Sequence, residues 1–228
     1  MKLLAALLLA VSSLARAAPS EINAEYQLTS AGMSIGRVVE SFVRKGDTYA
    51  IQSVTRSEGV LKLLMDDQIV LSSSGRVVAG GLQPLAFAQH RARDASRDVD
   101  ATFDWERGVL RSLSEGKQVE VPLPRETQDR LSVMYQFMNL ERGATVVMPM
   151  SNGRKVELYT YRLVKEVRLA TLAGEFETAH YERVVANPKE SRTEVWLAKD
   201  RFNFPVKVVF DDPKGLRVEQ SLVALQAR

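Results

Sequence analysis

The chain has 228 residues, of which 45% are hydrophobic and 7% aromatic, and it contains no Cys. This length and composition suit one domain with a sizeable core, and the lack of Cys excludes disulfides, thiol chemistry and an N-terminal lipid-modified Cys. The formal net charge is +3 with the two signs mixed along the chain. There is neither the basic tract of a nucleic-acid-binding protein nor a Gly-rich phosphate loop.

The first 17 residues have the features of a cleaved secretory signal. Lys2 supplies a positive charge, residues 3–11 are all apolar, and Ala15 and Ala17 stand at the small-residue positions before a cut. The apolar run is shorter than the roughly 20 residues that span a membrane. We therefore expect a periplasmic protein, without a lipid anchor or a transmembrane span, whose residues 18–228 form a single domain. Loss of Lys2 and Arg16 lowers the net charge to +1.

Alternation of apolar and polar residues predicts β-strands along most of the chain, with turns rich in Gly, Asn and Asp between them. This pattern is typical of a mainly β protein built as a sheet, sandwich or barrel. A short apolar run at residues 60–65 fits either a helical turn or a strand. The predicted strands cover residues 21–30, 33–44, 48–56, 68–74, 97–105, 109–114, 117–122, 146–150, 155–164, 166–172, 176–185, 192–197, 206–210 and 216–225.

One segment breaks the alternation, and its spacing predicts an amphipathic helix over residues 128–140. Thr127 is placed to cap this helix, and Asp129 lies in the first turn, where the helix dipole favours a negative charge. We expect a single curved antiparallel sheet, or a half-open β-barrel or sandwich, with the helix on its concave face. The apolar face of the helix carries Leu131, Met134, Tyr135 and Met138, with Phe137 beside it.

Two interpretations of this helix face stay open. Met134 and Met138 fit an ordinary core, and they also fit the lining of a pocket that adapts to varied apolar ligands. Under the second interpretation the ligand-binding residues are Leu131, Met134, Phe137 and Met138 from the helix, with Trp105 and Trp196 from the sheet.

Several blocks in this order resemble the DUF3108 family of exported bacterial proteins of unknown function. The resemblance spans nearly the whole mature chain and implies an architecture more than an activity. The blocks are residues 26–28 with 32–36, 74–75 with 81–84, 103–105, 128–136, and 194–200 with 204–207.

The C-terminal block has a second, looser resemblance, carried by Trp196, Asp200, Pro205 and Gly215. Its strand–turn–strand pattern is similar to the C-terminal part of periplasmic lipoprotein-carrier domains, which are half-open barrels that hold acyl chains. This resemblance implies a shape, and with it the possibility of a lipid ligand.

Catalytic and metal-binding patterns are weak. Residues 32–36 match the G-x-S-x-G motif, which would make Ser34 a nucleophile with His90 or His180 as its base, but the flanking sequence predicts two strands and a hairpin turn. Two His residues and no Cys argue against zinc, and the acidic pair at residues 211–212 fits a turn better than a calcium site.

We therefore expect a non-enzymatic periplasmic protein that binds an apolar or amphipathic envelope ligand, such as a lipid or an acylated partner, with no cofactor and no metal. The alternative is an envelope module that interacts with a protein or a glycan. A serine hydrolase using Ser34 is the third and disfavoured hypothesis. A continuous apolar cavity would favour the first function, whereas a packed interior with an exposed aromatic patch would favour the second.

Overall fold

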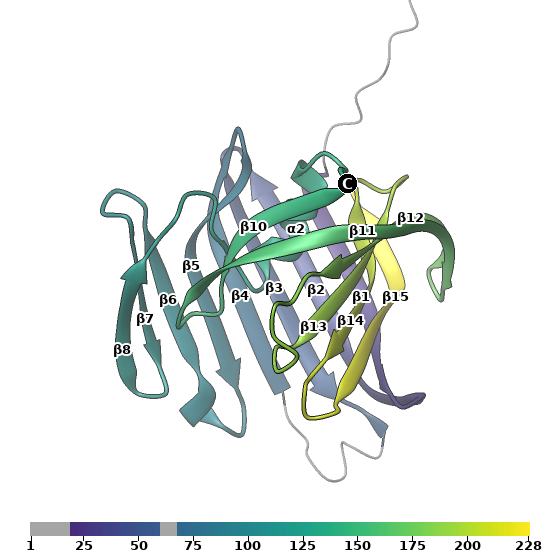
Figure 1. Cartoon of the computed structure of the whole chain (residues 1–228), viewed down its shortest axis with the longest axis horizontal. Helices are drawn as coiled ribbons and strands as arrows, with labels where there is room; N and C mark the ends of the chain where they lie inside the picture. The colour runs from purple at the N-terminus through teal and green to yellow at the C-terminus, as the bar shows by residue number, and fades with distance from the viewer. Residues whose placement is uncertain (1–18, 60–67) are drawn as a thin grey trace, which may run out of the picture.

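The computed structural model describes residues 19–59 and 68–228, which form one fifteen-stranded sheet curled around a short helix (Figure 1). Neighbouring strands are antiparallel, except that β9 pairs parallel to β10. The strands are β1 (Glu21–Ser30), β2 (Met33–Lys45), β3 (Thr48–Ser57), β4 (Gln68–Val78), β5 (Gly81–Arg91), β6 (Val99–Asp104), β7 (Val109–Ser114), β8 (Lys117–Pro122), β9 (Gln128–Asp129), β10 (Thr145–Ser151), β11 (Val156–Thr171), β12 (Gly174–Arg183), β13 (Arg192–Ala198), β14 (Phe204–Asp211) and β15 (Arg217–Ala227).

The strand order is β8-β7-β6-β5-β4-β3-β2-β1-β15-β14-β13-β12-β11-β10-β9. Two meanders, β1–β8 and β10–β15, are therefore joined through the first and last strands. The antiparallel β1–β15 pairing runs from Ile22 opposite Ala227 to Thr29 opposite Glu219. The mainly β class and the curved, open sheet with a helix on its concave face confirm the fold expected from the sequence.

Three predictions about individual strands were wrong. β5 was not predicted, because Pro84 and a register shift opposite Gly75 interrupt its alternation. Residues 155–164 and 166–172 are one strand, β11, with a bulge near residue 164 and no turn. The strand predicted at residues 97–105 begins at Val99, because Ala95–Arg97 forms a 3-10 turn, η1. The ambiguous run at residues 60–65 and the signal segment lie outside the described residues.

The predicted helix is shorter than its apolar spacing indicated. Helix α2 covers Ser132–Gln136 and continues as a 3-10 turn, η2 (Phe137–Asn139), while Gln128 and Asp129 form strand β9. Thr127 does not cap the helix, because its hydroxyl donates instead to the carbonyl of Pro124. Among the described residues, none of the helices is long and apolar enough to cross a membrane.

Helix α2 lies between two walls of the curled sheet. In Figure 1, β10 and β11 cross in front of it and β2–β4 lie behind it. On the rear side, the Tyr135 ring stacks on Phe42 of β2 with centroids 5.2 Å apart. On the front side, Phe137 meets Tyr161 of β11 edge-on at 5.2 Å. The helix thus fills the concave face and joins the cores of the two walls.

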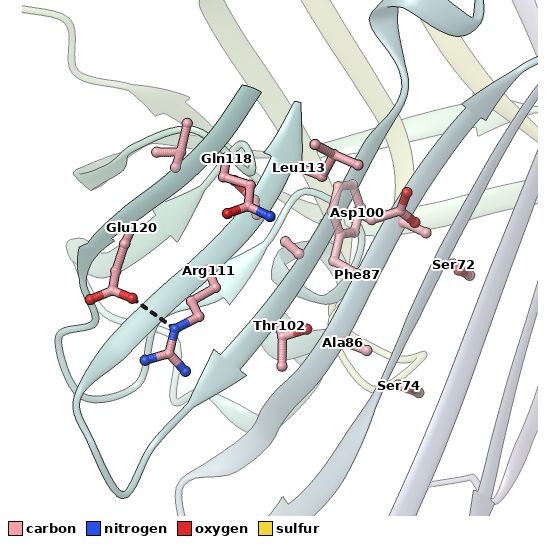
Figure 2. A pocket seen from close by; sticks show the side chains of 14 residues that line it. Ser72, Ser74, Ala86, Phe87, Asp100, Thr102, Arg111, Leu113, Gln118 and Glu120 are labelled. Atoms are coloured by element: carbon pink, nitrogen blue, oxygen red, sulfur yellow. Dashed lines mark hydrogen bonds and ion pairs between the residues drawn. The ribbon is translucent and has the colours of Figure 1, made fainter. Parts of the chain in front are cut away.

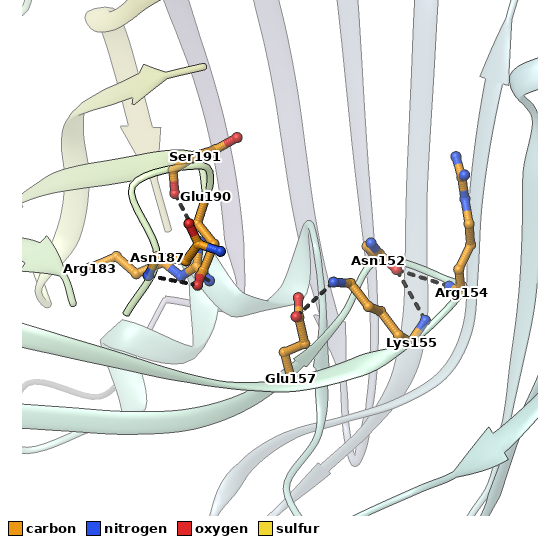
Figure 3. Close-up of polar contacts among 8 residues, drawn as sticks. All are labelled: Asn152, Arg154, Lys155, Glu157, Arg183, Asn187, Glu190 and Ser191. Carbon is orange, nitrogen blue, oxygen red and sulfur yellow. Dashed lines mark hydrogen bonds and ion pairs between the residues drawn. The ribbon is translucent and has the colours of Figure 1, made fainter. Parts of the chain in front are cut away.

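The two arms of the sheet also meet at the tip of the β10–β11 hairpin. Ser112 of β7 donates a hydrogen bond to the carbonyl of Gly153, and Arg154 forms a 3.0 Å ion pair with Glu115. Figure 3 shows how the tip is ordered: Asn152 accepts hydrogen bonds from the backbone N–H groups of Arg154 and Lys155, at 3.0 and 3.2 Å. Within the described chain, side-chain and turn contacts close this seam, since no strand of one arm pairs with a strand of the other there.

Candidate functional site

The helix is attached to the sheet by polar side chains that have no access to water. Asp129 is fully buried, and its Oδ1 accepts hydrogen bonds from the backbone N–H groups of Leu131 and Ser132, at 2.8 and 2.7 Å. Its Oδ2 accepts a 2.6 Å hydrogen bond from Ser73 of β4, whose hydroxyl also lies 3.1 Å from that of Tyr49. Burial raises the pKa of Asp129, although these hydrogen bonds oppose the shift.

A second buried carboxylate lies under the helix. Glu40 of β2 accepts hydrogen bonds from Ser53 at 3.1 Å and from the Tyr135 hydroxyl at 3.2 Å. Burial raises the pKa of Glu40 to about 7, because desolvation disfavours its charged form more than the two donors support it. Glu40 therefore exchanges its proton near neutral pH while in contact with the helix.

Two glutamines attach the β4–β5 turn to the segment that contains β9 and helix α2. Gln136 accepts a 2.8 Å hydrogen bond from the Leu82 N–H and donates one of 2.8 Å to the Gly80 carbonyl. Gln128 donates to the Leu82 carbonyl at 2.8 Å. The residues 128–136 that carry part of the family resemblance thus hold the helix inside the sheet.

The four helix residues predicted to bind a ligand lie in the core. Leu131 and Phe137 are 3% and 1% exposed, and Met134 and Met138 are partly buried against the same clusters. The void beside Met138, lined also by Ile22, Phe204 and Leu225, has a volume of only about 20 Å³. The inner face is therefore packed around the helix at this position.

The two tryptophans lie apart from one another in the fold. Trp105, just after β6, stacks on Phe103 and donates a 2.6 Å hydrogen bond to the carbonyl of Pro84. Trp196 of β13 stacks on His180 with centroids 4.0 Å apart. Neither ring contacts the void beside Met138.

A much larger hollow, of about 620 Å³, lies on β4–β8 (Figure 2). Most of its lining residues alternate along the strands with buried ones such as Ser73 and Phe87, so it opens on the face away from the helix. We call it the outer groove. Its lining includes Ser72, Ser74, Ala86, Ala88, Asp100, Thr102, Arg111, Leu113, Gln118 and Glu120.

The chemistry of the outer groove is mixed. Short hydroxyl and methyl side chains form its floor, and Leu113, which is 47% exposed, adds an apolar surface. Arg111 is held by Glu120 at 2.7 Å and Asp104 at 3.3 Å, and its hydrogen bond to Glu120 raises the pKa of the guanidinium. With its one arginine paired to carboxylates, the groove does not favour an anion.

A second hollow of about 320 Å³ adjoins the outer groove. The two share Thr102 and Arg111, and the second also contains Trp105, Gln83 and Leu85. Trp105, one of the six predicted ligand-binding residues, therefore lines this second hollow. The groove itself could not be predicted from the sequence, because short Ser, Ala and Thr side chains on a strand carry no distinctive chemical pattern.

The arrangement expected of a serine hydrolase is not formed within the described residues. The G-x-S-x-G motif connects two antiparallel strands, β1 and β2, where the nucleophile elbow needs a strand followed by a helix. Ser34 accepts a hydrogen bond from Gln27 and none from a histidine. His90 pairs with Asp98 and Asp100, and His180 pairs with Glu194.

Fold and site together define a β-barrel-like protein with an open sheet, a helix filling its inside and a groove on its outside. The family described as "Protein of unknown function (DUF3108)" matches residues 25–221. The chain belongs to this family, as the sequence blocks indicated.

Among solved structures, the chain is similar to a β-barrel-like protein of the domain of unknown function DUF1849 from Brucella abortus. The TM-score is 0.60 at 14% identity, covering 93% of this chain and 99% of that one, which supports the half-open barrel architecture. It also matches a putative exported protein with a YmcC-like fold from Bacteroides fragilis, at 13% identity over 91% of this chain and 96% of that one, with a TM-score of 0.33.

A third match is a putative outer membrane lipoprotein-sorting protein domain from Vibrio parahaemolyticus. The identity is 10% over 92% of this chain and 86% of that one, with a TM-score of 0.29. No curated protein matches the chain.

Proposed function

We propose that this protein is a non-enzymatic binding protein of the bacterial cell envelope, in the periplasm, and that the outer groove holds an amphipathic ligand such as a lipid or an acylated partner. The observation that carries the proposal is the contrast between about 620 Å³ in the outer groove and about 20 Å³ beside the helix. A pocket for a small molecule typically has a volume of roughly 300–1,000 Å³.

The lining supports an amphipathic ligand over a purely apolar or purely polar one. An alkyl chain alone would cover the hydroxyls of Ser72, Ser74 and Thr102 without giving them hydrogen-bond partners, which costs free energy. A fully polar solute would gain nothing from Leu113 and the two alanines of β5. A ligand with an apolar part and hydroxyl or amide groups satisfies both kinds of surface.

The experiment is native mass spectrometry of protein purified from the periplasm, followed by thermal shift with a lysophospholipid below its micelle concentration. Thr102→Trp fills the point that the outer groove shares with its neighbour. Val39→Trp, on the exposed side of β2, is the matched control. We expect a co-purifying ligand and a thermal shift that Thr102→Trp removes and Val39→Trp retains.

No co-purifying ligand together with no thermal shift would refute the proposal. If binding is retained in Thr102→Trp but lost in Met138→Phe, the ligand binds at the inner face beside the helix, as predicted from the sequence.

A glycan-binding module is the second candidate, and one observation favours it. Trp105 lies in the hollow next to the outer groove, where an aromatic ring offers a surface for a sugar. A thermal shift with a neutral oligosaccharide, lost in Trp105→Ala and absent with the lysophospholipid, would select this candidate.

A further inference from the structure

Three potential metal ligands converge on β12 and β13. His180 and Glu182 are two residues apart on β12, Glu194 is the cross-strand partner of Glu182, and Trp196 is the partner of His180. One ligand atom from each of His180, Glu182 and Glu194 lies within 4.8 Å of the other two. The buried core residues Tyr181 and Val195 alternate with these three, so the cluster is on the face away from the helix.

We propose that this cluster is a binding site for a divalent transition metal such as Zn²⁺. The ligands are Nε2 of His180 and one carboxylate oxygen each from Glu182 and Glu194, with the fourth position left to solvent. One imidazole and two carboxylates are a ligand set that zinc accepts, at about 2.0–2.2 Å from each atom. Ligand atoms around such an ion lie roughly 3–3.6 Å apart, so side-chain rotations suffice to close the site.

The charges of the cluster support a cation. Like charges placed directly opposite each other on adjacent strands destabilise a sheet, and Glu182 faces Glu194 in this way. Among the described residues, Glu182 makes no ion pair or hydrogen bond, although Arg162 of β11 lies opposite it. Arg217 lies 3.7 Å from Oε1 of Glu194, on the oxygen that does not face His180, and also pairs with Asp211 and Glu219. Arg217 therefore does not neutralise both Glu182 and Glu194, and a divalent ion would supply the missing positive charge.

The imidazole is already oriented. His180 is 6% exposed, its ring lies 4° from parallel to Trp196, and Nε2 is 2.8 Å from Oε2 of Glu194. In the metal-free protein, a neutral imidazole with its proton on Nε2 donates that proton to Glu194. A metal ion on Nε2 requires this proton to move to Nδ1, so the neutral ring keeps it. Because protons compete with the metal for the three ligand groups, binding still depends on pH.

The same ring also limits the affinity. Nδ1 of His180 is buried and has no hydrogen-bond partner, so after metal binding its N–H would have no acceptor. Metal-bound histidines usually donate this proton to a neighbouring group, and loss of such a partner weakens affinity roughly 10–100-fold. We therefore expect a micromolar site, weaker than that of a structural zinc protein.

The second histidine provides a control within the same chain. His90 of β5 also lies beside two carboxylates, but Asp98 is 3.1 Å from Nδ1 and Asp100 is 3.5 Å from Nε2. The carboxylates face different nitrogens of an exposed ring, so they do not converge on one point. No metal site was expected from the sequence, because the two His residues are far apart, Cys is absent, and the pairing of Glu182 with Glu194 across strands cannot be read from the sequence.

The test is isothermal titration of the chelator-treated full protein with ZnCl₂, at two pH values. We expect one Zn²⁺ per chain, tighter at the higher pH, with at least about tenfold weaker binding in His180→Gln and Glu182→Gln and unchanged binding in His90→Gln. Cu²⁺ adds a readout of position, because it quenches a nearby tryptophan. Trp196→Phe should remove most of the quenching and retain the binding, whereas Trp105→Phe should retain both.

Circular dichroism checks that each variant folds. If His180→Gln does not, Glu182→Gln still decides the question, because the Glu182 side chain has no hydrogen bond or ion pair to lose among the described residues. No saturable binding by the unmodified protein would overturn the proposal, as would binding that is lost in His90→Gln and retained in Glu182→Gln. None of these outcomes bears on the outer groove, which lies on β4–β8.

Discussion

Ser73 of β4 donates a 2.6 Å hydrogen bond to Asp129, which lies 56 positions later in the chain and accepts a hydrogen bond from the backbone N–H of Ser132, the first residue of helix α2. The same carboxylate thus joins the helix backbone to the wall of the sheet. This contact explains why Asp129 is buried, although its polar side chain fits the solvent-facing side of the helix predicted from the sequence.

Asp129→Ala should destabilise the protein by about 3 kcal/mol. It removes the acceptor for the Leu131 and Ser132 N–H groups and leaves the buried Ser73 hydroxyl without this partner. Urea unfolding measures the change. Asp129→Asn retains an acceptor oxygen and should lose only about 1 kcal/mol. Equal losses in the two variants would show that the carboxylate does not hold the helix.

Glu40 should make the protein less stable as the pH rises towards neutrality. Between its ordinary pKa of 4.5 and its folded pKa of about 7, the folded protein retains a proton that the unfolded chain has released. The free energy of unfolding should therefore fall by about 3 kcal/mol across this interval.

Glu40→Gln should remove most of this dependence and make the protein more stable than the unmodified chain at pH 8. Burial also raises the pKa of Asp129, so Asp129 contributes a change of the same sign. Urea unfolding at pH 5 and pH 8 measures both effects, with the exposed Glu106→Gln as control. A free energy of unfolding that does not change between pH 5 and pH 8 would contradict this account of Glu40.

Gly153→Ala should loosen the seam between the two arms of the sheet. Gly153 has φ +86°, and a Cβ there would lie 2.3 Å from Cγ1 of Val99. We expect a loss of about 2–4 kcal/mol in urea unfolding, from both backbone strain and the clash. Gly116→Ala shares the positive φ, +70°, but meets no atom within 4 Å, so it measures the strain alone. Equal losses in the two would mean that the hairpin tip is not packed against β6.

Gln136→Ala should release the β4–β5 turn from the helix. It leaves the Leu82 N–H and the Gly80 carbonyl without their side-chain partner, at a cost of about 2 kcal/mol. Hydrogen exchange of the Leu82 amide should become faster while that of the β1–β2 amides stays unchanged. Uniformly faster exchange would indicate global destabilisation in place of a local one.

The strands could be predicted from the sequence because period-two alternation directly reflects one buried face. The helix boundaries could not be predicted, because the polar side chains of Gln128, Asp129 and Gln136 are buried. There they form hydrogen bonds with backbone groups, whereas their sequence pattern is that of a solvent-facing helix side. Strand β5 was hidden because Gly75 and Pro84 meet at a register shift, which changes which residues face inward.

Sites made by pairing across strands are also invisible in a single sequence. Glu182 and Glu194 are opposite each other only because β12 and β13 pair in one register, and Thr102 joins two hollows only because five strands curve together. Trp105 and Trp196 could be selected from the sequence as aromatic residues. The hollow beside Trp105 and the stacking of Trp196 on His180 could be seen only in the fold.

The pairing of β1 with β15 also determines when the sheet is completed. All other pairings between strands of the described chain join sequence neighbours, so each meander can form from contacts between successive strands. The inner strand edges of β1 and β14 stay without partners until residues 217–227 arrive. Non-local pairing of this kind is slow, and open edges invite aggregation. The folding chain thus passes through a state with two open strand edges, which only the last strand, β15, closes.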